Sequence, residues 1–91
     1  MIKVLQANKF RKVFKRLPQN AQKIVKTEIK NLLEDPLKGE PKKGALKNMR
    51  VVKFKINHQL MLLAYEYKAK KLTLFLIGLG SHENFYRDLE R

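Results

Sequence analysis

The end of the chain, GSHENFYRDLER from residue 80 to 91, brings together side chains that suit phosphodiester chemistry. An imidazole titrates near neutral pH, so His82 is a candidate for proton transfer. Phe85 and Tyr86 follow within one helical turn and offer ring faces for a nucleobase, and Arg87 offers a fork of donors for a phosphate. We therefore predict that His82 and Tyr86 are catalytic, with Tyr86 orienting a base or the scissile phosphate. Phe85 and Arg87 are predicted to bind substrate.

The segment RVVKFKI, residues 50–56, supplies a second group of candidates. Side chains two apart in a strand point the same way, so Lys53 and Lys55 would lie roughly 7 Å apart on one face. Taken alone, the pair is typical of ordinary surface lysines. Beside the histidine it favours a catalytic role, in which both ammonium groups stabilise negative charge on a phosphodiester. Arg50, which begins the segment, and His58, two residues after its end, are predicted to contact substrate, and His58 equally fits a structural place in a turn.

The charge of the chain predicts an anionic partner. Lys and Arg number 21 against 8 Asp and Glu, which gives a net charge of +13 and a pI of about 10.2. No acidic residue precedes Glu28, and Glu40 is the only one between Lys38 and Lys55. Self-repulsion on so small a chain destabilises the folded state, so we favour a functional basic surface over a merely solvated one. Nucleic acid, an acidic protein or a membrane surface would fit it.

Cysteine and long apolar runs are absent from the sequence. With no cysteine and two histidines, the chain predicts neither a disulfide nor a structural zinc site, and we expect no cofactor and no metal. No stretch resembles a signal peptide or approaches the ~20 apolar residues of a membrane span. These features favour a cytoplasmic protein that does not associate with a membrane.

Two amphipathic helices are predicted in the first half of the chain, after a short strand at residues 2–5. Asn8 is the expected N-cap of the first helix, whose apolar residues recur at helical spacing before Pro18 ends it. Asn20 is the expected cap of the second helix, which runs to Asp35-Pro36. The apolar positions of the two stripes are Phe10, Val13, Phe14 and Leu17, and then Ala21, Ile24, Val25, Ile29, Leu32 and Leu33. The two predicted helices form a helical hairpin, and its apolar stripes must pack against another layer of the fold.

The residue pattern in the second half of the chain predicts a sheet. A long basic loop, residues 35–48, leads into the strand 50–56, and Asn57-His58 predicts a turn. The nearly continuous apolar runs 60–65 and 72–79 suit central strands buried on both faces. We therefore expect a single α+β domain over residues 1–91, in which an N-terminal helical hairpin packs on one face of a small antiparallel-dominated sheet. Its element order is β-α-α-β-β-β with a short C-terminal tail or helix.

Taken in this order, the two helices, the strands RVVKFKI and LMLLAYEY and the terminal LTLFLIGLGSHENFYRDL resemble the RelE/ParE superfamily of toxins from bacterial type II toxin–antitoxin systems. The resemblance implies that Lys53 and Lys55 match the basic pair of the family's second strand. His82 falls where RelE-like toxins place a basic residue or histidine, and the aromatics after it look most like the YafQ branch. Tyr86, or Phe85 in another register, matches the C-terminal aromatic.

One position departs from the family pattern. The arginine that usually precedes the tyrosine of the third strand is missing, because Leu62, or Gln59 in a shifted register, stands there before Tyr65. Arg50 or Arg87 could supply that charge from elsewhere.

The resemblance implies two activities for the chain. RelE-like members are endoribonucleases that cut mRNA on the ribosome, and the residues above favour this activity, with a metal-free attack by the ribose 2′-hydroxyl. ParE-like members instead poison DNA gyrase, and a simple basic RNA-binding domain is a third alternative. The family also implies a cognate acidic antitoxin that binds a monomeric toxin, for which Lys12, Lys15 and the Lys42-Lys43 loop are candidate contacts.

Overall fold

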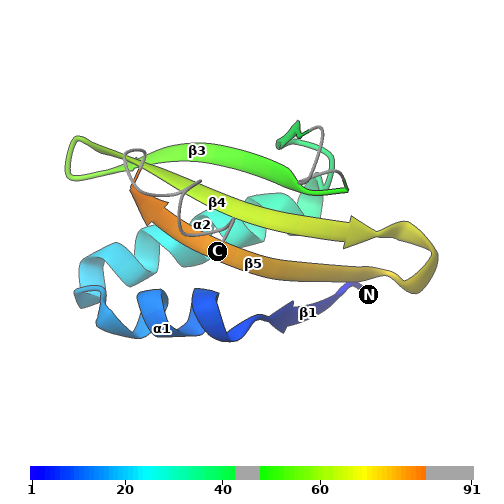
Figure 1. Ribbon diagram of the computed structural model, residues 1–91, viewed down its shortest axis with the longest axis horizontal. Coiled ribbons are helices and arrows are strands. Elements are labelled where there is room, and N and C mark those ends of the chain that lie inside the picture. Colours follow the sequence, from blue (N-terminus) through cyan, green and yellow to red (C-terminus); the bar gives the residue numbers. More distant parts are fainter. Residues whose placement is uncertain (43–47, 82–91) are drawn as a thin grey trace.

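Two helices pack on one face of a five-stranded mixed sheet in the computed structural model of the protein, which describes residues 1–42 and 48–81 (Figure 1). The strand order across the sheet is β1-β5-β4-β3-β2. The elements in chain order are β1 Lys3–Gln6, α1 Asn8–Arg16, α2 Gln19–Glu34, β2 Glu40–Pro41, β3 Arg50–Ile56, β4 Gln59–Lys68, a 3₁₀ turn Ala69–Lys71 and β5 Thr73–Ser81. This architecture confirms the predicted α+β fold.

The helical hairpin forms as predicted, but its N-caps differ. Asn8 is the first residue of α1 rather than its cap, and α2 begins at Gln19 directly after Pro18, so neither asparagine caps a helix. The side chain of Gln22 joins the two helices instead. Its Nε2 donates to the carbonyl oxygens of Phe14 at 3.0 Å and Leu17 at 3.2 Å. Carbonyls at a helix C-terminus have no partner within the helix, so this contact satisfies the end of α1.

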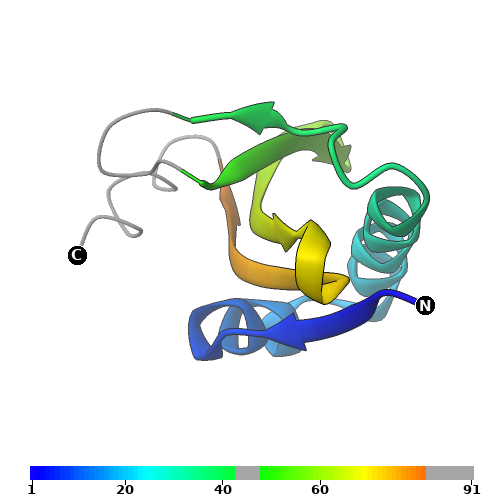
Figure 2. The ribbon, with the colours of Figure 1, turned by 90° about the vertical axis from the view of Figure 1, so that its right-hand side faces the viewer.

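The main core lies between the helices and one face of the sheet. Phe10 of α1 and Val25 and Leu32 of α2 are buried there against Phe54 of β3 and Leu63 of β4. The side view shows the sheet curving over α2, while α1 lies along the β1 edge (Figure 2). α1 packs chiefly on β5, and α2 reaches β3. Because burial of apolar area is the main force of folding, this contact decides which face of each strand turns inward.

The sheet combines a three-stranded antiparallel meander with two edge strands. β3 pairs with β4 and β4 with β5, as predicted, and β1 adds in parallel to β5. The register shifts between Ala64 and Tyr65, where Ile77 of β5 has no partner. β2, a two-residue strand beside Arg50, lies inside the segment predicted as a loop. Pairings of this kind join distant segments, and no local periodicity indicates them.

A second apolar cluster lies on the face of the sheet that the helices do not cover, which we call the open face. Val51, Leu62 and Ala64 are buried there, with Met49 and Ile77 packed against them. The central strand β4 is therefore buried on both faces, as its continuous apolar sequence predicts.

The hydroxyl of Tyr65 ties the segment after α2 to the sheet. It donates to the carbonyl of Pro36 at 2.7 Å and accepts from the backbone N–H of Gly39 at 2.8 Å. A Cβ at position 39 would stand 2.7 Å from this hydroxyl oxygen, so glycine is required for the close approach. Lys38, in the same segment, lies 3.7 Å from the Oε2 atom of Glu28 on α2.

We expect Tyr65→Phe to lower the free energy of unfolding by about 1–3 kcal/mol, because it leaves the buried N–H of Gly39 and the part-buried carbonyl of Pro36 without their partner. Urea denaturation would measure the change. Tyr67→Phe is the matched control on the same strand, and its expected effect is within about 0.5 kcal/mol. Equal effects of the two variants would contradict the role given to the Tyr65 hydroxyl.

Candidate nucleic-acid interface on the open face

Lys53 and Lys55 project from the open face of the sheet. β3 buries Val52, Phe54 and Ile56 in the main core, and both intervening lysines are exposed. The two side chains therefore project from the same face of β3, and the Cα atoms that carry them are about 7 Å apart. The structure confirms this part of the predicted arrangement.

Neither lysine has an electrostatic partner in the part of the chain that the structure describes. The ion pairs there join Lys38 to Glu28, Lys42 to Glu40 and Lys68 to Glu66, and none involves β3. Two neighbouring cations without a counter-charge repel each other, and an anion bridging them would relieve this repulsion. The pair is therefore available for a phosphodiester.

The C-terminal end of β5 reaches the same level of the sheet as the lysine pair. Lys53 pairs with Leu62 of β4, which pairs with Gly80 of β5. The next residue of β5, Ser81, pairs with Met61, and Met61 pairs with Phe54. Neighbouring strands lie about 4.8 Å apart. Because β4 lies between β5 and β3, the end of β5 is roughly 10 Å from β3.

His82, Phe85, Tyr86 and Arg87 lie outside the described residues. The catalytic roles predicted for His82 and Tyr86, and the substrate contacts predicted for Phe85 and Arg87, therefore stay predictions.

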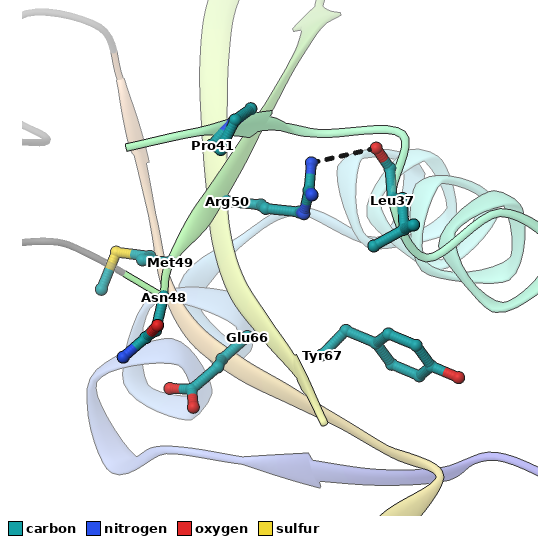
Figure 3. A pocket seen from close by; sticks show the side chains of 7 residues that line it. All are labelled: Leu37, Pro41, Asn48, Met49, Arg50, Glu66 and Tyr67. Atoms are coloured by element: carbon teal, nitrogen blue, oxygen red, sulfur yellow. Dashed lines mark hydrogen bonds between the residues drawn. The ribbon is translucent and has the colours of Figure 1, made fainter. Parts of the chain in front are cut away.

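The structure does not bring Arg50 to the lysine pair. Arg50 stands at the other end of β3, and its Nη1 donates to the carbonyl oxygens of Gly39 at 2.8 Å and Leu37 at 3.2 Å. Figure 3 shows the guanidinium directed at Leu37. The side chain thus holds the segment after α2 in place, which argues against Arg50 as the replacement for the missing strand arginine.

Arg50 also borders a cavity of about 400 Å³ at the end of β3 (Figure 3). It forms where β4 continues past the start of β3, since Arg50 pairs with Tyr65 and the next residues of β4 have no partner on β3. The cavity is lined by Leu37, Pro41, Asn48, Met49, Arg50, Glu66 and Tyr67. No sequence pattern indicates it, because its walls come from four separate segments.

His58 lies in the predicted turn between β3 and β4. Asn57 and His58 have φ values of 49° and 71°, which is the left-handed conformation that a two-residue hairpin turn requires. The histidine is exposed and follows Lys55 by three residues, at the end of the sheet opposite Arg50. This position confirms the turn, and its contact with substrate stays a prediction.

The two positions considered for the family's strand arginine carry no charge. Leu62 is fully buried on the open face beside Lys53, in the second apolar cluster. Gln59 is exposed at the hairpin end of β4, where it pairs with Ile56. The lysine pair therefore has an apolar neighbour where the family pattern has a cation.

Burial raises the pKa of Tyr65 above its ordinary value, although the N–H of Gly39 and the charge of Arg50 oppose this shift. The phenol therefore stays protonated and keeps its hydrogen bond to Pro36. Tyr65 is a structural anchor on the helix side of the sheet, and the lysine pair lies on the other side.

The described residues contain neither a membrane-spanning helix nor a metal-binding cluster. In residues 1–42 and 48–81, no helix is long and apolar enough to cross a membrane. In the same ranges no three or more His, Asp or Glu side chains gather where they could hold a metal ion.

The chain belongs to the ParE-like toxins of type II bacterial toxin–antitoxin systems, because the model of that family matches residues 4–90. This match, together with the fold, places it in the RelE/ParE superfamily that the sequence resembles. A comparison with curated proteins found no match.

Solved structures of toxins share the fold over nearly the whole chain. A metal-bound toxin from Helicobacter pylori is 35% identical, with a TM-score of 0.70 over 92% of this chain and 98% of that one. The toxin of the Escherichia coli RelBE toxin–antitoxin complex is 18% identical, with a TM-score of 0.72 over 89% of this chain and 96% of that one. The matching chain of the RelBE2 toxin–antitoxin complex from Mycobacterium tuberculosis is 17% identical, with a TM-score of 0.74 over 89% of this chain and 98% of that one. The last two likenesses show the fold alone.

We expect Arg50→Met to lower the free energy of unfolding by about 1.5–3 kcal/mol, because the variant cannot make the hydrogen bonds from a charged group to two carbonyls. Urea denaturation would measure it. Lys53→Met, on the same strand but with no partner among the described residues, is the control and should change stability by less than about 0.5 kcal/mol. An unchanged stability of the Arg50 variant would show that the guanidinium is not an anchor.

Proposed function

We propose that this toxin is an endoribonuclease that cuts mRNA on the ribosome and so inhibits translation. One observation carries the proposal: among the described residues, Lys53 and Lys55 stand unpaired on the open face, level with the end of β5. His82 follows that end directly in the sequence, and the proposal assigns it a role in the same site. A cationic pair next to a group that transfers protons suits the cleavage of a phosphodiester.

The proposed reaction is an attack of the ribose 2′-oxygen on the adjacent phosphorus. A bond forms between the 2′-oxygen and phosphorus, and the bond from phosphorus to the 5′-oxygen breaks. The products are a 2′,3′-cyclic phosphate and a 5′-hydroxyl. The 2′-hydroxyl gives its proton to a base, and His82 gives a proton to the leaving 5′-oxygen. No step is assigned to a metal ion.

Lys53 and Lys55 would stabilise the extra negative charge that the phosphorane carries during the attack, and one of them could act as the base. Tyr86 would orient a base or the scissile phosphate. The buried other face of β3 fixes the backbone that carries the two lysines, and so sets the spacing of their side chains.

We also propose an acidic antitoxin as the protein partner and the cytoplasm as the location. The related E. coli and M. tuberculosis structures are toxin–antitoxin complexes. A net charge of +13 would be partly neutralised by such a partner, and an acidic segment over the lysine pair would block the site. The toxin would then be a monomer within the complex.

A second function, inhibition of DNA gyrase without cleavage of RNA, is favoured by two observations. The matching family model is that of ParE-like toxins, and the buried Leu62 stands where a nuclease of this superfamily would carry an arginine. A plain RNA-binding domain would bind with a steep salt dependence and leave no cut products. Parallel assays for gyrase-linked DNA breaks and for cut transcripts separate the three functions.

The variant Lys53→Met/Lys55→Met should cut ribosome-bound mRNA more slowly by on the order of 10²–10³, because charge on the phosphorane is no longer stabilised. Sequencing of transcript ends would measure the rate. Lys70→Met/Lys71→Met, at the exposed β4–β5 turn, makes the same change in net charge and should cut at the parent rate. A similar decrease in both variants would mean that net charge matters and the β3 pair does not.

His82→Ala should lower the cleavage rate by about 10²–10⁴, the usual contribution of a positioned acid or base. A general acid must hold its proton, so the parent rate should fall as pH rises through the range in which an imidazole deprotonates, and the variant should lack this fall. Rate against pH on ribosomes would show both effects. Parent-like cleavage by His82→Ala would refute the assignment.

A further inference from the structure

The cavity at the end of β3 opens onto an unpaired edge of β4. The two strands pair as far as Arg50 and Tyr65, and beyond that point they separate and leave a space of about 400 Å³. Glu66, Tyr67 and Lys68 still pair with β5, but no described strand pairs with them on the other side. The backbone N–H and C=O groups of a strand serve both of its edges. This edge of β4 can therefore form hydrogen bonds with a chain that enters the cavity.

Arg50 lines the cavity with part of its guanidinium unused. Its Nη1 donates both of its hydrogen bonds, to the carbonyl oxygens of Leu37 and Gly39, whereas Nε and Nη2 have no partner among the described residues. The ion pairs of that part of the chain do not include Arg50 either. The two carbonyls fix the direction of the guanidinium, and its free N–H groups form the planar fork that binds a carboxylate. The anchoring of Arg50 thus also orients a site for an anion.

Apolar surface makes up much of the remaining wall. It comes from Leu37, Pro41, Met49 and the ring of Tyr67. Leu37 is 62% exposed, so part of this surface is open to a partner. Among the lining residues, Glu66 is the one carboxylate, and its side chain leaves β4 on the opposite face from Tyr67 (Figure 3), with its Oε1 3.9 Å from the Nζ of Lys68. An aliphatic stem that ends in a carboxylate matches this combination of an apolar wall and a cationic fork.

The cavity suits a protein segment better than a nucleic acid. Binding of a phosphate backbone depends on several cations that release its counterions. Arg50 is the only cation among the lining residues. The neighbouring Lys42 and Lys68 each have a glutamate as an ion-pair partner. A single cation beside apolar surface therefore favours one carboxylate of a peptide over a row of phosphates.

We infer that this cavity binds an extended acidic segment of a protein partner. One carboxylate of the segment accepts hydrogen bonds from Nε and Nη2 of Arg50, a neighbouring apolar side chain packs on Leu37, and the backbone pairs with the free edge of β4. The inference rests on the proposed acidic partner and gives it a second contact. Lys53 stands three residues after Arg50, about 10 Å along β3, and projects from the opposite face. The cavity is therefore separate from the lysine pair.

The test uses two matched leucine variants. Leu37→Glu places a carboxylate within reach of Arg50, and Leu72→Glu makes the same change in charge at a leucine that is 48% exposed after the 3₁₀ turn. The probe is a hexapeptide of alternating glutamate and valine, blocked at both ends, and NMR follows its binding to the full chain. In the parent it should shift the backbone amide signals of Glu66–Lys68 and the Nε–H signal of Arg50. Leu37→Glu should bind it about tenfold more weakly, the usual effect of losing a charged hydrogen bond, and Leu72→Glu should bind it like the parent.

A peptide with glutamine in place of glutamate should also bind the parent about tenfold more weakly. Equal weakening in the two leucine variants would overturn the inference, because only net charge would then act. Shifts confined to Lys53 and Lys55 would overturn it too, and would leave the acidic partner of the lysine pair in place. A short oligoribonucleotide that shifts the Arg50 signal more than the peptide does would assign the cavity to RNA instead. Failure of the nuclease proposal would appear separately, as parent protein that leaves transcripts uncut.

Discussion

Burial of two apolar helix stripes against one face of the sheet is the constraint on which the rest of the structure depends. It turns Val52, Phe54 and Ile56 of β3 inward, and the pleat of the strand then leaves Lys53 and Lys55 outward. It also turns the apolar side of α1 inward and its cations outward. The same packing therefore places the lysine pair on the open face and the exposed cations of α1 on the other side of the molecule.

Polar anchors hold the segment after α2 at the opposite end of β3 from the hairpin turn. The Tyr65 hydroxyl contacts Pro36 and Gly39 inside the core, and Arg50 binds two carbonyls of the same segment. Arg50 is thus a cation that hydrogen bonds hold in place within the protein, whereas the lysines of β3 have no such partners among the described residues. Among basic residues on one strand, this difference separates a structural anchor from the candidates for catalysis.

The superfamily resemblance and the structure agree on the fold. The fold does not determine the activity, which depends on the residues of the site. Family membership follows from a match over residues 4–90, yet members of one superfamily share a fold without sharing a reaction. Leu62 illustrates the point, because its burial on the open face puts an apolar side chain where RelE-like toxins are expected to place a cation. The unpaired lysines of β3, within the described part of the chain, are what favour cleavage here.

The sequence by itself determined the helical hairpin, the meander, the turn at Asn57-His58 and the direction of Lys53 and Lys55, because each follows from a local period or a turn signal. Only the tertiary structure decided that β1 adds in parallel to β5, that Glu40 and Pro41 form an edge strand, and that Lys53 shares a row with Gly80. Arg50 shows the limit most clearly: its type indicated a phosphate contact, and its carbonyl partners come from a segment more than ten residues away. Pairing and anchoring depend on which distant segments meet in the core, and no local pattern of residues carries that information.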